Sequence, residues 1–339
     1  MKLKPSLSQV FGLLLIMVTL QSCEPTQPGS WKNEQISSPD KFHQLNIELL
    51  KQLKVNNEKD LENIMSRDFI DTRSKNRQIE LVSNRVKATD YTLLDEYYVV
   101  NRYISGDTIS SGSKGPSGYS LTYQGATHEM YFAFFVPKNK SIANQEMITA
   151  VYCKYDYGWK LSQLDVSRYK VNGKTAPELH DQARQCYNKG FLIDALNISS
   201  SAIDCSRPSD LWKYNSEEDM SSFYNKVLRE AYGLYRFPLA IKQVPSHPYI
   251  IRIFNQTTPE GVFPMIYYIS SIKVQDTTAI KQENENIKKV INQTLPGIDQ
   301  GKKYVLYSAF NKLPSGMTVD HFDMTAKLKW NKSKQYTGQ

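Results

Sequence analysis

The sequence predicts an α+β protein made of three successive folded segments. Apolar residues between positions 40 and 87 recur with helical spacing, whereas residues 91–166 are rich in Tyr, Phe, Val and Ile, with turn residues between the runs. Residues 177–206 return to helical spacing, and residues 245–330 alternate between strand and helix patterns. This order predicts helices packed on a curved antiparallel sheet, followed by a helical hairpin region and a small ββαββ domain.

The first 22 residues carry the pattern of a signal peptide. Lys2 and Lys4 precede the almost unbroken apolar run Phe11–Leu20. Lysines favour the cytoplasmic side while an apolar run enters the bilayer, and this run is shorter than the ~20 residues of a stable span. We therefore expect residues 1–22 to be removed rather than kept as an anchor.

Cys23 follows this segment directly and is the candidate lipidation site. The residues Leu20-Gln21-Ser22-Cys23 resemble the processing site of bacterial lipoproteins, and the resemblance implies that the Cys23 thiol takes a diacylglycerol and becomes the new N-terminus. An ordinary secretory signal or a short anchor is the alternative. Residues 23–38 are polar at first, with two prolines, and predict a lipidated tether. The expected location is the bacterial cell envelope, in the outer membrane, facing the periplasm or the cell surface.

Charge and cysteine content narrow the function classes. The 42 Lys and Arg residues against 34 Asp and Glu give a formal net charge of +8 over 339 residues. No tight basic run is interleaved with aromatic residues, so we expect no nucleic-acid partner.

Cys153, Cys186 and Cys205 remain besides Cys23, and without a C-x-x-C pair they predict buried thiols rather than a zinc site. We expect no metal and no cofactor.

The first folded segment is expected over residues 39–170. Helices are predicted from Asp40 onward, over Glu58–Met65 and over Asn76–Lys87. Strands are predicted at Tyr91–Ile104, Tyr119–Tyr123, Glu129–Val136, Glu146–Tyr155 and Trp159–Val166, with a Gly/Ser loop at Ser105–Ser120. The order of these elements resembles the cone-shaped nuclear-transport-factor-like fold. That resemblance implies an interior that holds a ligand or, in the enzymes of the fold, a His, Asp or Tyr general base.

One strand of this segment carries the candidate pocket residues. Along Glu129–Val136 the odd positions mix polar and apolar residues, whereas the even positions are all apolar. Because alternate residues of a strand share a face, the even face should meet the helices and line any cavity. The candidate lining residues are Met130, Phe132, Phe134 and Val136. Packing is the first expectation and a ligand cavity the second, because no polar groups converge there to orient a ligand.

Residues 176–235 are expected to be helical. Gly190 lies where one helix would turn into the next, between small residues placed where the helices would touch, namely Ala183, Ala195 and Ala202. This pattern resembles one tetratricopeptide helix pair, and a single pair cannot bury its own face, so it should pack on a neighbouring domain. A turn at Gly190 would separate Cys186 from Cys205 by on the order of 16 Å, which excludes a disulfide between them. A further helix is expected over residues 217–234.

The last segment is expected over residues 245–331, followed by a basic tail at residues 332–339. Four strands and one helix are predicted, the strands at Tyr249–Phe254, Val262–Val274, Lys303–Phe310 and His321–Trp330 and the helix at Thr278–Asn292. The tail is more typical of a frayed end than of a binding arm.

Few motifs point to catalysis. Ser111–Lys114 matches the S-x-x-K of penicillin-recognising enzymes, but it lies in a loop and has no S-D-N or K-T-G partner. Neighbouring residues on a strand point to opposite faces, so His128 and Glu129 could not act on the same substrate. Residues 320–323 include three side chains of the kind that bind metals, but for the same reason Asp320 would lie on the opposite face from His321 and Asp323, and two ligands do not make a closed metal site. Asp95 lies on a candidate strand, but no His–carboxylate pair is expected to share one face.

The sequence therefore favours a non-catalytic, membrane-anchored envelope lipoprotein that acts as a protein-binding or scaffold module. Its partners would be the membrane, through the N-terminal lipid, and an envelope protein. The alternatives are a small-molecule carrier and an enzyme, either of which would use the apolar pocket of the cone-like segment. A buried polar dyad in the pocket would favour the enzyme, and an open apolar pocket would favour the carrier.

Overall fold

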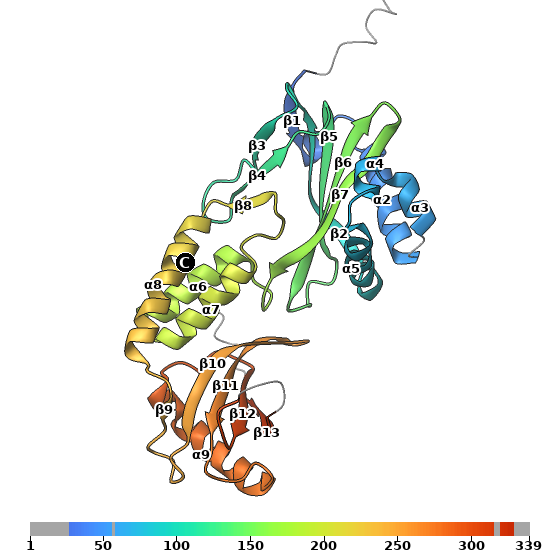
Figure 1. Cartoon of the computed structure of the whole chain (residues 1–339). Coiled ribbons are helices and arrows are strands. Elements are labelled where there is room, and N and C mark those ends of the chain that lie inside the picture. Colours follow the sequence, from blue (N-terminus) through green and yellow to red (C-terminus); the bar gives the residue numbers. More distant parts are fainter. Residues whose placement is uncertain (1–26, 56–57, 315–318, 329–339) are drawn as a thin grey trace, which may run out of the picture.

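The computed structural model describes residues 27–55, 58–314 and 319–328, and its helices and antiparallel sheets confirm the α+β class. The protein is elongated (Figure 1): a five-stranded sheet with its helices lies at the end where the chain enters, three helices lie in the middle, and a second five-stranded sheet lies at the other end. The expected signal peptide, Cys23 and the tail at 332–339 lie outside the described residues. None of the helices within these ranges has both the length and the apolar character needed to cross a bilayer.

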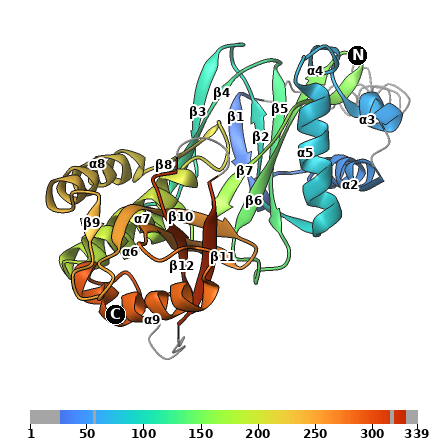
Figure 2. The same ribbon diagram turned by 60° about the horizontal axis from the view of Figure 1, so that its bottom comes forward.

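The first sheet is antiparallel and has the strand order β1-β2-β5-β6-β7. Its strands are β1 (Gly29–Lys32), β2 (Tyr91–Val100), β5 (Glu129–Pro137), β6 (Gln145–Tyr155) and β7 (Gly158–Lys170). One face is covered by the helices α2 (Asp40–Val55), α3 (Glu58–Ile64), α4 (Arg67–Ile70) and α5 (Lys75–Ala88), which Figure 2 shows on one side of the sheet. Phe42 and Leu49 of α2 share this core with Tyr131 and Phe135 of β5. The apolar stripe of α2 therefore finds its partner on the sheet.

The opposite face of the first sheet is buried as well, against a smaller sheet of order β3-β4-β8. Its strands are β3 (Gly106–Ser110), β4 (Tyr119–Gln124) and β8 (Trp212–Tyr214). Met130, Phe132 and Phe134 point to this side, so the prediction that they meet the N-terminal helices is wrong. The odd residues Tyr131 and Phe135 meet those helices instead. Both faces of β5 are largely apolar, and the alternation alone could not show which one faces the helices.

Two short strands lie in stretches that the sequence predicts to be irregular. β1 and the 3-10 helix η1 (Asn33–Gln35) lie inside the expected tether of residues 23–38, and β3 lies inside the expected loop of residues 105–120. β1 pairs antiparallel with β2, and Gly29 lies opposite Val100. β2 ends at Val100, four residues before the predicted end at Ile104. The folded body therefore begins much closer to Cys23 than expected.

The middle layer consists of the helices α6 (Ala176–Asn188), α7 (Leu192–Asp204) and α8 (Glu217–Leu234). A capping box starts α6, in which the Thr175 N–H donates to Oε2 of Glu178 at 2.7 Å. Gly190, with a φ of 76°, makes the turn into α7. Leu179 joins the core beneath the small sheet, whereas Ile193 joins the core of the second five-stranded sheet. The helix pair thus packs on both of its neighbours.

Three free cysteines lie in the described ranges. Cys153 and Cys205 are buried, and Cys186 is half-buried. Burial raises the pKa of Cys205 to about 12 and also raises the pKa of Cys153 and of Cys186. Because the thiolate is the reactive form, these thiols are poor nucleophiles at neutral pH.

The second five-stranded sheet has the order β13-β12-β11-β10-β9. Its elements are β9 (Leu239–Ala240), β10 (Tyr249–Thr258), β11 (Gly261–Ile269), α9 (Thr277–Thr294), β12 (Tyr304–Phe310) and β13 (His321–Lys327). The pair β11–β12 is parallel, because α9 carries the chain back across the sheet between them. Ile280 and Ile287 of α9 pack on Ile266 and Tyr268 of β11.

Polar side chains fix the second sheet to the other two layers. Asn172, on the turn after β7, accepts a hydrogen bond from the Val262 N–H at 2.7 Å and donates one to the Val262 carbonyl at 2.9 Å. Lys302, in the loop after α9, donates to the buried Asp194 of α7 at 2.5 Å. One contact thus joins the second sheet to the first sheet, and the other joins it to the helices.

Candidate functional site

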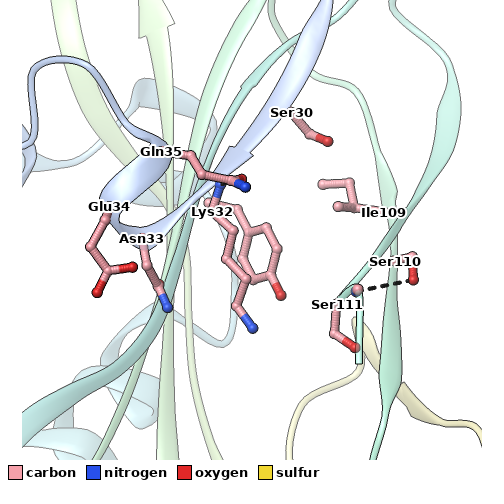
Figure 3. Close-up of a pocket in the computed structure, with 10 residues that line it drawn as sticks. Ser30, Lys32, Asn33, Glu34, Gln35, Ile109, Ser110 and Ser111 are labelled. Carbon is pink, nitrogen blue, oxygen red and sulfur yellow. Dashed lines mark hydrogen bonds between the residues drawn. The ribbon is translucent and has the colours of Figure 1, made fainter. Parts of the chain in front are cut away.

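A cleft lies between the edge strands of two sheets. β1 is an edge strand of the first sheet and β3 is an edge strand of the small sheet, and both border this cleft of about 320 Å³ (Figure 3). Its lining is mostly polar: Ser30, Lys32, Asn33, Glu34, Gln35, Tyr97, Ile109, Ser110, Ser111 and Gly112. Segments far apart along the chain therefore meet at one polar site.

Asn33 shapes the wall of the cleft next to β1. Its φ of 49° lies in the left-handed region, which Asn tolerates better than most residues. Its Nδ2 donates to Oδ1 of Asp95 at 2.9 Å, and its Oδ1 accepts the Glu96 N–H at 2.9 Å. Beside it, Oε1 of Gln35 accepts the Lys32 N–H at 3.1 Å. These bonds turn the chain after Lys32 and hold η1 against β2.

A cluster of one ion pair and two phenols lies beside the cleft. Nζ of Lys32 is 3.0 Å from Oδ2 of Asp95, to which the Tyr119 hydroxyl also donates. The hydroxyls of Tyr97 and Tyr119 form a hydrogen bond of 2.8 Å. Nζ of Lys32 lies 5.5 Å from the ring centroid of Tyr97 and 5.3 Å from that of Tyr119. The register of β2 shifts between Leu93 and Asp95, a bulge of the kind that redirects a side chain.

Burial and hydrogen bonding set the protonation states in this cluster. Burial lowers the pKa of Lys32, but the hydrogen bond and the charge of Asp95 outweigh it, so the net pKa is raised. Burial and then the hydrogen bond with Asp95 raise the pKa of Tyr119 far above the usual range of a phenol, and burial raises the pKa of Tyr97. At neutral pH the cluster holds a lysine cation paired with Asp95 and two neutral phenols. None of these groups is an unengaged base or nucleophile.

Glu96, the next residue of β2, lies on the helix side of the sheet. Its Oε1 is 2.9 Å from Nε2 of His43, and its Oε2 accepts a hydrogen bond of 2.6 Å from the Tyr131 hydroxyl. Nδ2 of Asn46 donates to the Tyr131 hydroxyl at 2.7 Å. The expectation that no His–carboxylate pair shares a face is therefore wrong. The two residues are 53 positions apart, so only the packing of α2 on β2 brings them together.

The four candidate pocket residues lie in a packed core. Met130, Phe132 and Phe134 are buried and Val136 packs against the same cluster, and none of the four lines the cleft. The ring of Phe134 lies 5.3 Å from that of Trp212 on β8, in an edge-on contact. A strand from outside the predicted cone thus fills the space beside these residues. The candidate lipidation site, Cys23, lies outside the described residues.

The S-x-x-K motif contributes one residue to the cleft. Ser111 lines it, but its Oγ accepts hydrogen bonds from the Tyr119 N–H at 3.0 Å and from the Ser113 N–H at 3.3 Å. Lys114, at the other end of the motif, is exposed. The serine hydroxyl therefore stabilises the turn between β3 and β4, and nothing in its contacts resembles an activated nucleophile.

The other two motifs are polar contacts at strand ends. Glu129 pairs with Lys154, while the neighbouring His128 is exposed. Nε2 of His321 lies 3.6 Å from Oδ2 of Asp323, and both side chains are largely exposed. In the ranges that the structure describes, no group of three or more His, Cys, Asp or Glu side chains is placed to hold a metal ion.

Comparison with known proteins adds no assignment. No protein-family model, no curated protein and no solved structure matches the chain. The functional interpretation therefore rests on the geometry of the cleft, on the charges around it and on the N-terminal sequence.

Proposed function

We propose that the protein is a non-catalytic envelope lipoprotein, anchored through Cys23, that binds an extended segment of a partner protein in the cleft between β1 and β3. One observation carries this proposal: two edge strands, neither of which pairs with a further strand of the described residues, border the same polar cleft. An unpaired strand edge is a template for a further strand, and proteins use this mode, β-augmentation, to recognise extended peptides.

The backbone of β3 is oriented for such pairing. The Ser111 N–H donates to the Tyr119 carbonyl at 2.8 Å, toward β4. Because backbone groups alternate sides along an antiparallel strand, the N–H and C=O of Ser110 point away from β4 and toward the free edge. On the opposite wall, the Lys32 N–H is engaged by Gln35. An incoming strand would therefore pair with β3 and place its side chains against β1.

The surroundings favour a binding protein over the two alternatives. A carrier for apolar ligands would need an open apolar face, but Phe132 and Phe134 are fully enclosed in a core. An enzyme would need an available base or nucleophile, but Lys32, Asp95 and Tyr119 are engaged with one another. The polar lining of the cleft suits main-chain groups and polar side chains, so a peptide is the ligand class that fits it.

Selection from a random peptide library on the purified protein tests the proposal. Ser110→Pro removes an outward N–H at an edge position that contributes no ladder bond to β4, so the fold should survive. We expect peptides that bind the wild type and bind this variant about tenfold or more weakly, since losing one hydrogen bond of ~1.4 kcal/mol corresponds to that factor.

Ser110→Ala is the matched control, because it removes only the hydroxyl and keeps the backbone N–H. Peptides that bind through β-augmentation should retain their affinity for Ser110→Ala. Equal binding to wild type and Ser110→Pro would place the peptides elsewhere and refute the proposed cleft. Thermal melting of both variants establishes that each one is folded.

A further inference from the structure

The strand register defines which loops lie at the end where the chain enters. Gly29, at the start of β1, lies opposite Val100, and Val100 lies opposite Glu129. The loops of residues 101–105 and 125–128, which follow Val100 and precede Glu129, therefore lie at the same end of the first sheet as Gly29, where β1 begins (Figure 1).

The loop after β2 exposes two large apolar side chains at this end. Tyr103 is 72% exposed and Ile104 is 66% exposed. The guanidinium of Arg102 lies 5.9 Å from the Tyr103 ring centroid. Tyrosine suits a membrane interface because its ring is apolar and its hydroxyl is polar, and a neighbouring arginine can reach lipid phosphates. Side chains of this kind on a loop tip suit contact with the surface of a membrane.

A rigid base holds this loop in place. The buried Asn101 donates its backbone N–H to the His128 carbonyl at 2.8 Å and its Nδ2 to the Thr127 carbonyl at 2.7 Å. Its Oδ1 accepts a hydrogen bond of 2.8 Å from the Tyr123 hydroxyl. These bonds tie the two loops together, so the exposed side chains beyond Asn101 are presented to the outside by a fixed support.

The hairpin between β6 and β7 offers a second aromatic tip at the same end. Tyr157 is 46% exposed, and its ring stacks on that of Tyr155 at 5.1 Å. The guanidinium of Arg67 lies 5.3 Å from the Tyr157 ring centroid, and Nζ of Lys160 lies 6.0 Å from it. Asp156, also exposed, is the acidic residue at this tip. Two aromatic tips accompanied by cations thus flank the end of the sheet.

The distance to the lipidation site is short. Cys23 precedes Gln27, the first described residue, by four positions, and four extended residues span at most ~14 Å. We propose that this end of the protein rests on the phospholipid bilayer, with Tyr103 and Ile104 in the interfacial region and Arg102 at the lipid phosphates. The inference depends on the lipidation of Cys23 in the proposed function. It fixes the orientation of the protein, with the second five-stranded sheet farthest from the membrane.

Site-specific fluorescence of the full-length lipoprotein tests this orientation. Cys186→Ser removes the half-buried thiol, and Tyr103→Cys introduces a new one for labelling. The protein is reconstituted into vesicles of phosphatidylethanolamine and phosphatidylglycerol, and the new thiol is then labelled with the environment-sensitive fluorophore NBD. Tyr232→Cys is the matched control: Tyr232 is 69% exposed and follows Ala231, which belongs to the core of the second sheet. At position 103 we expect emission at shorter wavelength and quenching by spin-labelled lipid chains. At position 232 we expect neither the shift nor the quenching.

The outcomes separate this inference from the anchoring on which it depends. Vesicle-bound protein with equally solvent-like emission at both positions would overturn the orientation and leave the anchor intact. Protein that does not float with vesicles and takes the label at Cys23 would overturn the anchor and the orientation together, because an acylated thiol cannot react. Ile104→Cys and Leu234→Cys, at residues that are each 66% exposed, repeat the comparison with Tyr103 in place.

Discussion

At the scale of single residues, Asn33 couples the cleft to the first sheet through both ends of its amide. Asn33→Ala removes the bonds to Asp95 and to the Glu96 N–H and leaves a β-carbon at a φ of 49°. We expect a loss of about 1–3 kcal/mol in the free energy of unfolding, because a partly buried acceptor of Asp95 and the N–H of Glu96 lose their partner. Urea denaturation measures this loss.

Asn33→Gly is the control for the backbone contribution. Glycine adopts a positive φ without strain but also lacks the amide, so its stability should fall between those of the wild type and Asn33→Ala. An alanine variant as stable as the wild type would show that the amide bonds contribute nothing to the fold.

The buried Asp194 should make the stability of the protein depend on pH in a distinct way. Burial raises the pKa of Asp194 to about 6 and outweighs the opposing charge and hydrogen bond of Lys302. A raised folded-state pKa contributes stability that is complete below the ordinary value of about 4 and is lost as the pH rises through 6. Relative to Asp194→Asn, the wild type should therefore lose up to about 3 kcal/mol between pH 4 and pH 7. Urea denaturation of both proteins across this range checks the sign, and a relative gain for the wild type would contradict it.

The residues of the site could be predicted only in part. The sequence places Asp95 on a strand, and Ser111 in a loop. It does not show that Asn33 meets Asp95, because 62 positions separate them and a bulge in β2 directs the carboxylate. The contact between His43 and Glu96 is hidden for the same reason, since it depends on how α2 lies across the sheet.

At the scale of elements, β5 is a strand with two buried faces, and Phe134 tests the face that the small sheet covers. Phe134→Ala should cost about 3–5 kcal/mol in the free energy of unfolding, because it removes a fully buried ring next to Trp212 and leaves a void. Tyr103→Ala, at an exposed position, should change stability by about 0.5 kcal/mol or less. Thermal or urea denaturation measures both. A small effect of Phe134→Ala would mean that this side of β5 is an open cavity.

The turn between β10 and β11 tests the joint between the two large sheets. A β-carbon at Gly261 would lie 2.4 Å from Oδ1 of Asn172. Gly261→Ala should therefore disturb the paired bonds of Asn172 and Val262 and cost about 1–3 kcal/mol, which includes the strain of its φ of 143°. Gly158→Ala is the control, because its φ is also positive but its β-carbon meets no atom within 4 Å. Equal melting temperatures for the two variants would exclude the clash as the cause.

Long elements were predictable, whereas short edge strands were not. The helical spacing of residues 40–53 and the apolar runs of β5 and β6 carry enough periodicity to indicate their type. β1 consists of four residues next to prolines, and β3 lies in a stretch rich in Gly and Ser. Such strands exist because distant partners hold them, so neither local composition nor alternation reveals them.

At the scale of the whole molecule, the proposed location in the envelope depends on Cys23. Lipid chains contribute ~0.8 kcal/mol per buried methylene, and two or more chains give stable attachment, so the wild type should fractionate with membranes. Cys23→Ala should be released or remain unprocessed. Fractionation together with gel migration distinguishes these outcomes, and a variant that behaves like the wild type in both would refute the lipidation of Cys23.

The α+β class followed from changes in periodicity along the chain, but the arrangement of the layers did not. β8 lies between helices α7 and α8 in the sequence, yet it completes the small sheet beside β4. Trp212 thereby belongs to the core of the first folded segment. The predicted end of that segment, residue 170, lies more than 40 residues before Trp212 in the sequence. A division of the chain into consecutive domains cannot represent a strand that returns in this way.

β1 is also the mechanical connection between the N-terminal segment and the rest of the protein. A pull on Gly29 away from the body acts along β1 and loads its ladder with β2 in shear, so that all of its residue pairs resist together. Once β1 separates, the four residues of β1 and the three of η1 add about 24 Å of extended chain. Lys32 and Asn33 then leave the cleft that they line. Tension that separates β1 from β2 would therefore also take apart the proposed binding cleft.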